Sequence, residues 1–281
     1  MKIPFLKMSG AGNDFVVVDR MNETAKPGWI PVIPAMCDRP RGIGADGVIL
    51  ISPAENADFT MDYFNADGSS GSMCGNGGRC ASSYMMDLLG RDHVSFLACG
   101  RLYRGARSGN GVILDMDDPG LPRMNIPLRP GNVDLLGHFI DTGSPHLILV
   151  VDKDGPDAAT VLETGRKIRH HPEFSPSGTN VDFITIMGKE EVRIRTYERG
   201  VEAETRACGT GAVAAALVYS LLEGEEGTRS VRVTPLSGEI LRVGFRRTGM
   251  TFTDITLEGP AVVTFRGVYE TDPAVRNLNT S

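Results

Sequence analysis

Residues 209–222, GTGAVAAALVYSLL, contain no charged side chain. Alanine and leucine favour the α-helix, so this segment is predicted to be helical. A helix that is apolar on every side has to be buried on every side. The segment is also much shorter than the roughly 20 apolar residues that cross a bilayer. We therefore expect a helix inside the protein, surrounded by other elements.

Most of the remaining chain is predicted to form short strands separated by Gly, Pro, Asn and Asp. Some alternate in polarity, as VRIRTY does at 192–197, which suits a sheet with one face in water. We therefore expect strands of a sheet to pack around the apolar helix. Two further helices are expected, at 75–89 and 158–168. The predicted strands are 14–18, 47–51, 59–64, 93–97, 112–116, 147–151, 181–186, 192–197, 231–234, 239–243 and 252–257.

The sequence also resembles itself. CGNG begins at Cys74 and CGTG begins at Cys208, about half the chain length apart. Each motif follows a predicted strand and a polar loop, and each precedes a helix rich in small residues. We interpret this pattern as an internal duplication that gives two similar domains, each with strands around one central helix. The Pro- and Gly-containing stretch at 119–122 marks the linker between them.

The two motifs have a chemistry of their own. A cysteine at the N-terminus of a helix faces unpaired backbone N–H groups and the positive end of the helix dipole. That environment stabilises a thiolate, lowers the pKa of the thiol and binds carboxylates. If Cys74 and Cys208 face each other across a bound carboxylate, the adjacent α-carbon has an acid–base group on either face. That geometry removes a proton from one face and returns one to the other.

The chain resembles the diaminopimelate epimerase family over nearly its whole length. The resemblance rests on a series of motifs that occur in the family's order. They are MSGAGNDF from Met8, GIGADG from Gly42, FNADGS from Phe64, CGNGGRC from Cys74, GSPH from Gly143, TNV from Thr179, YERG from Tyr197 and ETRACGTGA from Glu204.

The resemblance implies an α/β (α+β) fold of two pseudo-symmetric barrel-like domains, each of strands wrapped around a central helix. The domains would be 1–118 plus 260–281, and 119–259, with the C-terminal segment packed back on the first domain and its last residues frayed. The implied activity is the cofactor-independent interconversion of LL- and meso-diaminopimelate, a step towards lysine and peptidoglycan.

The resemblance also assigns roles to matching residues. Cys74 and Cys208 are the implied acid–base pair, one thiolate and one thiol at any time. The implied cradle for the reacting carboxylate is the backbone N–H groups of Gly75, Asn76, Gly209 and Thr210. A clamp on the distal end of the substrate is implied at Asn13, Asn65, Asn180 and Arg199, and a guanidinium suits a carboxylate there. His146 and Glu198 are implied near the reacting centre, beside the substrate ammonium.

Two positions depart from the family pattern. Many relatives have Asn where this chain has Ser144, and some have Gln where it has Gly47. A serine has a shorter reach and a glycine has no side chain, so each change removes a polar contact. Both positions bear on the identity of the substrate more than on the type of reaction.

Composition excludes several other classes of protein. With 29 Lys and Arg against 35 Asp and Glu, the chain is mildly acidic and has no basic run that would bind nucleic acid. No apolar run is long enough to span a membrane, and the N-terminus has no apolar core typical of a secretory signal, so a cytoplasmic location is expected. A homodimer is a possible assembly that the sequence leaves open.

The cysteines and glycines allow further interpretations. Five cysteines, an odd number with no CxxC or CxH spacing, argue against a disulfide framework and a metal site. Cys37, Cys80 and Cys99 are expected to be small buried hydrophobic residues. The GxGxxG pattern at 42–47 is rejected as a dinucleotide site, because a strand and not a helix is predicted after it.

Three alternatives to the epimerase remain open. One is a racemase of another amino acid, such as histidine or proline, on the same fold. Another is a thiol redox sensor in which Cys74 and Cys208 form a disulfide. The last is a non-catalytic amino-acid binder, which would need no thiol at all.

Overall fold

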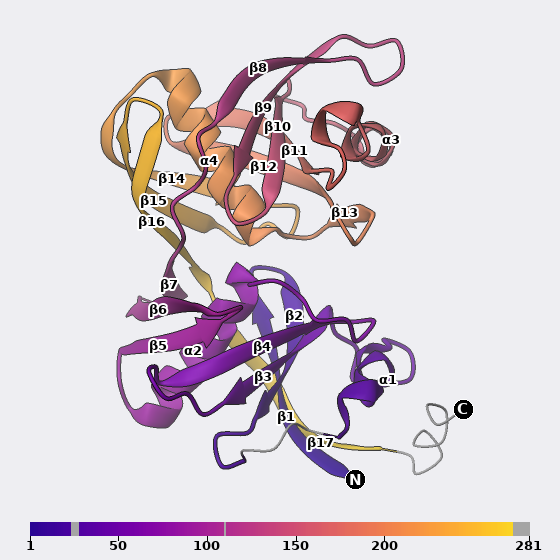
Figure 1. Cartoon of the computed structure of the whole chain (residues 1–281), viewed down its shortest axis with the longest axis vertical. Helices are drawn as coiled ribbons and strands as arrows, with labels where there is room; N and C mark the ends of the chain where they lie inside the picture. The colour runs from indigo at the N-terminus through magenta and orange to yellow at the C-terminus, as the bar shows by residue number, and fades with distance from the viewer. Residues whose placement is uncertain (24–27, 110, 272–281) are drawn as a thin grey trace. The chain divides into compact units, whose positions relative to one another are not determined.

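The computed structural model describes residues 1–23, 28–109 and 111–271. The chain forms two compact units (Figure 1), Met1–Leu114 with the described residues from Pro260 onward, and Asp115–Gly259. The chain enters the second unit a few residues before the expected linker at 119–122. The terminal residues expected to be frayed lie outside the described part of the chain. In that part, no helix is long and apolar enough to cross a membrane.

The first unit consists of strands around one helix. Its strands pair in the order β17-β1-β2-β3-β4-β5-β6-β7, in which β2–β3 and β4–β5 are parallel and the other pairs are antiparallel. The elements are β1 (Lys2–Gly10), β2 (Asn13–Asp19), η1 (Ile30–Val32), α1 (Ile33–Cys37), β3 (Gly47–Ser52), β4 (Phe59–Asn65), α2 (Gly75–Leu89), β5 (His93–Ala98), β6 (Arg101–Ser108), β7 (Gly111–Asp115) and β17 (Val262–Glu270).

The second unit has the same plan. Its main strands pair in the order β8-β9-β10-β11-β12-β14-β15-β16, with β10–β11 and β12–β14 parallel, while short β13 pairs with β12. The elements are β8 (Arg123–Leu128), β9 (Leu135–Asp141), β10 (Pro145–Val150), α3 (Ala158–Arg169), η2 (Pro172–Phe174), β11 (Asn180–Gly188), β12 (Glu191–Glu198), β13 (Ala203–Thr205), α4 (Gly209–Glu223), β14 (Gly227–Thr234), β15 (Leu241–Thr248) and β16 (Thr251–Pro260).

The two units repeat one topology. The series from β1 to β7 alternates antiparallel, parallel, antiparallel, parallel, antiparallel, antiparallel, and the series from β9 to β16 does the same when β13 is set aside. In both units a helix, α1 or α3, connects the first parallel pair, and a helix, α2 or α4, connects the second. Both units therefore have one repeated plan of strands and helices, as the repeated sequence pattern led us to expect.

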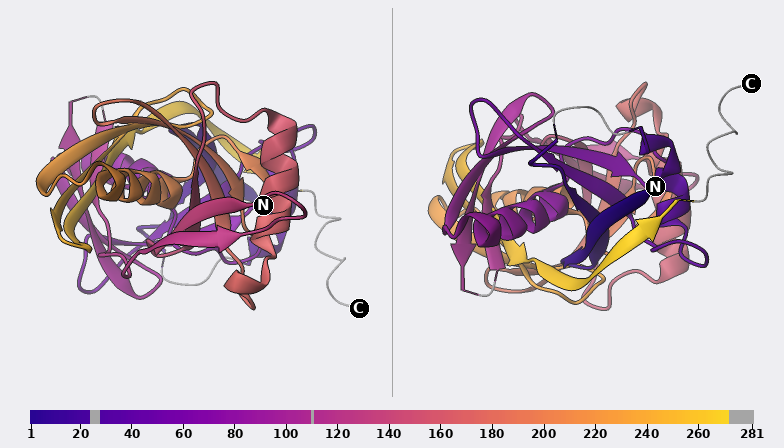
Figure 2. Two further views of the ribbon diagram at one scale, coloured as in Figure 1. Left: turned by 90° about the horizontal axis from the view of Figure 1, so that it is seen from above. Right: turned by 90° about the horizontal axis from the view of Figure 1, so that it is seen from below.

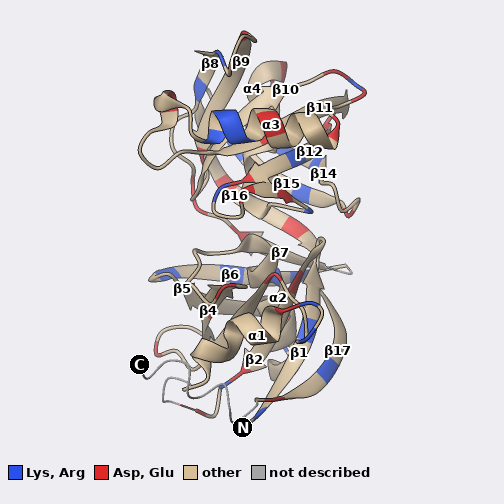
Figure 3. Cartoon of the chain, turned by 90° about the vertical axis from the view of Figure 1, so that its right-hand side faces the viewer, with Lys and Arg blue, Asp and Glu red and all other residues tan. Residues whose placement is uncertain are grey.

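The central helix of the second unit is enclosed as its composition requires. Residues 211–220 of α4 are all buried, and the helix packs against β9, β10, β11, β12, β14 and β15. Figure 2 shows α4 along the inside of the strands of its unit, with α3 on the outside. Charged residues mark the surface of α3 (Figure 3), whose buried Val161 and Ile168 face the sheet.

Both central helices end at a glycine in the left-handed conformation. Gly90 follows α2 with φ 64°, and Gly224 follows α4 with φ 77°. A glycine adopts this conformation without the steric penalty of a Cβ atom, so it stops the helix where the next strand begins. The C-terminal ends of both helices are thus fixed by one residue type.

The predicted helices are confirmed, and α4 extends one residue beyond the predicted 209–222. Each predicted strand overlaps an observed strand, but the one predicted at 239–243 is wrong at its start. Glu239 and Ile240 follow a turn at Gly238, which has φ 81°, and β15 begins only at Leu241. The strand predicted after the GxGxxG pattern is confirmed, because β3 begins at Gly47.

Gly165 is predicted to be essential for the packing of α3 on the sheet. A Cβ atom added there would lie 2.5 Å from Cβ of Tyr197, an atom close to the backbone that has little freedom to move. Alanine usually favours a helix over glycine by about 1 kcal/mol, but overpacking costs about 1–3 kcal/mol. We therefore expect Gly165→Ala to lower the free energy of unfolding, measured by denaturant titration.

The matched control is Gly188→Ala at the end of β11. A Cβ atom added at Gly188 meets nothing within 4 Å, so this variant should unfold like the wild type. A stabilised Gly165→Ala protein would contradict the close packing of α3 against Tyr197.

Candidate active site

Cys74 lies at the N-terminus of α2, after the polar loop that follows β4. It is the N-cap residue of the helix, and its Sγ accepts a hydrogen bond from the N–H of Gly77 at 3.4 Å. A Cβ atom added at Gly77 would lie 3.7 Å from that sulfur and 3.0 Å from Cδ1 of Ile49. The glycines of this turn therefore leave space beside the sulfur and keep the backbone amides accessible to an anion.

The Asn76 side chain connects this helix turn to β2. Its Nδ2 donates to Oδ1 of Asn13 at 2.5 Å, and its Oδ1 accepts from the fully buried guanidinium of Arg79 at 2.7 Å. Asn13 in turn donates from Nδ2 to the Asp46 carboxylate at 2.9 Å. Both ends of the Asn13 carboxamide are thus oriented by neighbours, and its role as a substrate ligand stays a prediction.

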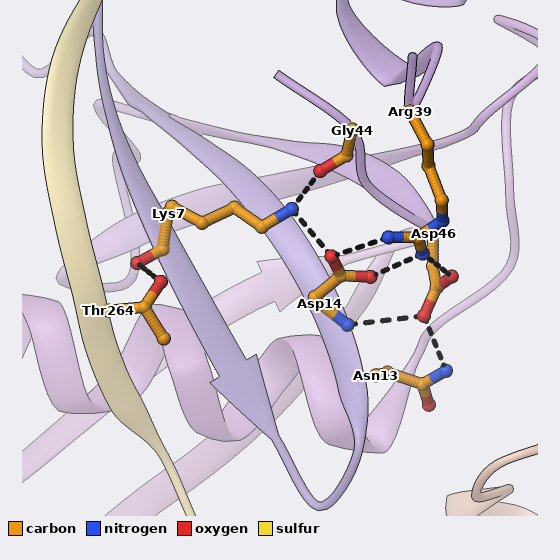
Figure 4. Close-up of polar contacts among 7 residues, drawn as sticks. All are labelled: Lys7, Asn13, Asp14, Arg39, Gly44, Asp46 and Thr264. Atoms are coloured by element: carbon orange, nitrogen blue, oxygen red, sulfur yellow. Dashed lines mark hydrogen bonds and ion pairs between the residues drawn. The ribbon is translucent and has the colours of Figure 1, made fainter. Parts of the chain in front are cut away.

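An ion-pair network supports Asn13 from behind (Figure 4). Arg39 donates to the carboxylates of both Asp14 and Asp46, and Lys7, which is only 6% exposed, donates to Asp14 at 2.6 Å and to the carbonyl of Gly44. Burial by itself would raise the pKa of Asp14, but hydrogen bonds from Arg39 and Lys7 outweigh it and hold that pKa at about 2. Asp14 is therefore ionised at neutral pH.

Two other expected residues of the first unit have local partners. Asn65 ends β4, and its Nδ2 donates to Oγ of Ser69 at 3.0 Å. At Gly47, an added Cβ atom would lie 2.5 Å from the ring of Tyr63, whose hydroxyl donates to the carbonyl of Asp46 at 3.4 Å. The Tyr63 ring thus occupies the space that a side chain at position 47 would need.

Cys208 holds the same place in the second unit that Cys74 holds in the first. It is the N-cap residue of α4, and its Sγ lies 3.4 Å from Oγ1 of Thr210. For this cysteine the expectation of a lowered thiol pKa is wrong. Burial, followed by the negative charges of Glu198 and Asp182, raises the pKa of Cys208 well above its usual value. Cys208 is therefore a thiol at neutral pH.

A buried polar chain lies beneath Cys208. The Asp182 carboxylate on β11 contacts Nδ1 of His146 at 2.6 Å and accepts from the hydroxyl of Thr196 at 2.6 Å. Nε2 of His146 lies 2.9 Å from Oγ1 of Thr210, the residue that also contacts the sulfur. Asp182 and His146 are both fully buried. The expected residue His146 is thus connected to Cys208 through the hydroxyl group of Thr210.

The other expected residues of the second unit gather around Asn180. Its Nδ2 donates to Oγ of Ser144 at 2.9 Å and to the carbonyl of Pro145 at 3.0 Å, and its Oδ1 accepts from the N–H of Arg199 at 2.8 Å. Asn180 therefore connects the loop before β10 to the loop after β12, the strand that ends at Glu198. The role of Asn180 as a direct substrate ligand stays a prediction.

Sequence reasoning missed several residues of these networks. Asp182 carried a signal, because it is the one charged residue in the predicted strand 181–186. Lys7, Arg39 and Thr196 carried none, since only the fold brings them to their partners. The assignment of Cys99 as buried was wrong: it lies exposed in the turn between β5 and β6, with φ 50°, while Cys37 and Cys80 are buried as expected.

Comparison with solved structures defines the class of fold. A PhzF-family phenazine biosynthesis protein from Bacillus anthracis has a TM-score of 0.75 at 13% identity, covering 96% of this chain and 100% of that one. A hydroxyproline epimerase from Agrobacterium vitis, with bound trans-4-OH-L-proline, has a TM-score of 0.73 at 17% identity, covering 97% and 94%. The chain therefore has the mixed α/β fold of the PhzF proteins and the proline racemase-type epimerases.

Sequence comparison gives the family within that class. The family model for diaminopimelate epimerase matches residues 5–100 and 138–257. A diaminopimelate epimerase from Chlorobaculum tepidum is 45% identical over 269 residues, covering 92% of this chain and 98% of that protein. Another from Aquifex aeolicus is 37% identical over 279 residues, covering 94% and 96%. The chain belongs to the diaminopimelate epimerase family and is an isomerase.

We predict that Asp14→Asn weakens the first unit in a pH-dependent way. Near neutral pH the loss should be about 1–3 kcal/mol, because buried Lys7 loses its carboxylate partner. The pKa of Asp14 is below its unfolded value, so its contribution is present above about pH 4 and is lost as the pH falls towards about 2. The difference between wild type and variant should shrink accordingly in denaturant titrations at decreasing pH.

Trp29, the single tryptophan, is buried in the first unit and reports on its unfolding by fluorescence. The control is Glu270→Gln, which removes a largely exposed ion pair with Lys2 and should change stability little. A difference between Asp14→Asn and wild type that stays constant with pH would contradict the assignment.

Proposed function

We propose that this protein interconverts LL- and meso-diaminopimelate, without a bound cofactor, by moving a proton at one α-carbon. Inversion of a carbon needs one group that removes a proton from one face and another that returns a proton to the opposite face. The proposal assigns these roles to Cys74 and Cys208. Its main support is the repeated placement of a cysteine at the N-cap of the central helix in both units.

The local geometry supports carboxylate binding at each helix. The first turns of α2 and α4 contain no acidic residue, and Gly75, Gly77, Gly209 and Gly211 are buried but have no side chains to block their amides. Unpaired N–H groups at a helix N-terminus attract a carboxylate. A substrate carboxylate bound there would hold its α-carbon next to the cysteine sulfur.

The family match favours diaminopimelate over other amino acids. The relatives that match over most of their length carry that substrate in their names, whereas the hydroxyproline epimerase shares only the fold. A cytoplasmic location and a homodimer are part of the proposal, and the five thiols without disulfides suit a reducing compartment. Native mass spectrometry would measure the assembly.

The direct test is proton exchange with turnover. Reduced protein is incubated with LL-diaminopimelate in heavy water, with no pyridoxal phosphate, nucleotide or added metal. The proposal expects meso product that carries deuterium at the inverted α-carbon. A folded protein that neither exchanges nor inverts this substrate would exclude the proposed function.

Each of the two cysteines is expected to be essential. Cys74→Ala and Cys208→Ala should each reduce epimerisation by about 10³-fold or more, because one of the two proton transfers loses its group. Cys99→Ala is the matched control, since Cys99 is exposed on the turn between β5 and β6 and caps neither helix. Full turnover by both single variants in the exchange assay would contradict the two-base mechanism.

Arg199 is expected to select the second carboxylate of the substrate. A guanidinium binds a carboxylate through two parallel hydrogen bonds, so Arg199→Met should raise KM for diaminopimelate about 10–100-fold and change kcat less. The control is Arg193→Met on the preceding strand β12, where the side chain is exposed. Steady-state kinetics with an unchanged KM in Arg199→Met would remove this residue from the substrate site.

A further inference from the structure

In the polar chain beneath Cys208, the chemistry of each group fixes which atom donates and which accepts each hydrogen bond. A carboxylate only accepts hydrogen bonds, so Asp182 requires that Nδ1 of His146 carries a proton. In the neutral ring, Nε2 is then the acceptor. The amide of Asn180 agrees with this tautomer, because its oxygen accepts from the N–H of Arg199 and its Nδ2 faces Nε2 at 3.4 Å.

The direction continues through Thr210 to the sulfur. With Nε2 as acceptor, the single hydroxyl proton of Thr210 is donated to His146 across 2.9 Å. The hydroxyl oxygen can then only accept from Cys208, whose Sγ lies 3.4 Å away. A thiol satisfies this arrangement by donating its S–H. A thiolate would face an oxygen lone pair unless Thr210 broke its bond to His146.

The first unit lacks this chain at the equivalent positions. In the first unit, Phe15 on β2 is the register partner of Gly47 on β3, and Ile49 on β3 is the partner of Tyr63 on β4. In the second unit, His146 on β10 is the partner of Asn180 on β11, and Asp182 on β11 is the partner of Thr196 on β12. Strand register therefore places Phe15, Ile49 and Tyr63 where the second unit has His146, Asp182 and Thr196.

The glycines of the two helices bear out this equivalence. A Cβ atom added at Gly77 meets Cδ1 of Ile49 at 3.0 Å, and one added at Gly211 meets Oδ1 of Asp182 at 2.9 Å. The positions that carry His146, Asp182 and Thr196 under Cys208 are thus occupied by Phe15, Ile49 and Tyr63 in the first unit.

We propose that Asp182 is a positioning residue which, through His146 and Thr210, holds Cys208 as the proton donor of the resting enzyme. This inference rests on the proposed function and deepens it, because it assigns the starting roles: Cys208 is the acid, and Cys74 is the base. Asp182 makes its hydrogen bonds to His146 and Thr196 and is connected to the sulfur through His146 and Thr210. It acts by fixing which ring nitrogen of His146 accepts a hydrogen bond.

The test measures the reactivity of each cysteine without any substrate. Only the thiolate reacts with iodoacetamide, so the alkylation rate follows the thiolate fraction. In Asp182→Asn, the amide can donate to Nδ1, so that Nε2 carries the proton and Thr210 turns its own proton towards Cys208. We expect the rate at Cys208 to rise about tenfold, which corresponds to one unit in thiol pKa. The rate at Cys74, resolved by peptide mass spectrometry, should not change.

A double-mutant cycle separates positioning from simple charge removal. The charged groups that act on Cys208 are Glu198 and Asp182, and removal of either negative charge by itself favours the thiolate. The charge effect alone remains without the hydroxyl, so if Asp182 acts mainly through Thr210, Asp182→Asn should accelerate alkylation of Cys208 much less in a Thr210→Val background than with Thr210 in place. An acceleration of equal size in that background would overturn the inference.

Thr196→Val is the matched structural control. It removes the other hydrogen bond of Asp182 and leaves the contact between Asp182 and His146 in place, so alkylation of Cys208 should stay close to wild type. The pH profile of alkylation is recorded for every variant. An Asp182→Asn profile at Cys208 that coincides with wild type would also overturn the inference.

A second measurement uses the wild-type protein. Nitrogen-15 NMR of labelled histidine should show Nε2 of His146 without a proton and Nδ1 with one, and the opposite tautomer would contradict the proposal. Neither measurement needs turnover. An enzyme inactive on diaminopimelate would exclude the proposed function alone, whereas an active enzyme with the opposite tautomer would exclude this inference alone.

Discussion

The enclosure of an uncharged helix by strands is the constraint on which the rest of this structure depends. The sides of α4 are apolar and buried from Gly211 to Ser220, so only its ends can contact water or a ligand. The C-terminal end is closed by Gly224, and the N-terminal end carries Cys208 with two glycines in the first turn. Burial of the helix therefore concentrates its unpaired N–H groups and its dipole at one cysteine.

The central helix of the first unit, α2, is also largely buried, but it contains more polar residues than α4. α2 buries Asn76 and Arg79 beside its small residues, and these polar groups need partners inside the protein. Asn13 supplies one, and Asp46 and Arg39 then hold Asn13 in place. The ion-pair network is thus a consequence of a more polar helix. It orients the carboxamides of Asn13 and Asn76, and Asn76 lies in the helix turn that Cys74 caps.

Local pattern predicted the parts of the fold that depend on neighbours in sequence. The three longer helices, the two N-cap cysteines and the duplication were all predicted from spacing and composition. The pairing of β1 with β17 joins residues from opposite ends of the chain, such as Lys2 with Glu270, and no local pattern contains that information. For the same reason the partners of Lys7 and Arg39 became known only from the fold.

The wrong prediction of a lowered pKa for Cys208 has a physical cause. Reasoning from helix N-termini alone predicted a lowered thiol pKa for both cysteines, but a dipole is one of several influences on a thiol. At Cys208, burial and the charges of Glu198 and Asp182 act in the opposite direction and dominate. Those influences come from β11 and β12, which the cysteine motif does not include.

A duplicated fold faces a particular requirement when it catalyses inversion. The backbone of both halves can be the same, because both sides of the reaction need a helix N-terminus and a sulfur. Their protonation cannot be the same, since one sulfur must begin with a proton and the other without. The difference therefore has to come from side chains behind the sulfurs. The replacement of Phe15, Ile49 and Tyr63 by His146, Asp182 and Thr196 provides that difference while leaving the strand register intact.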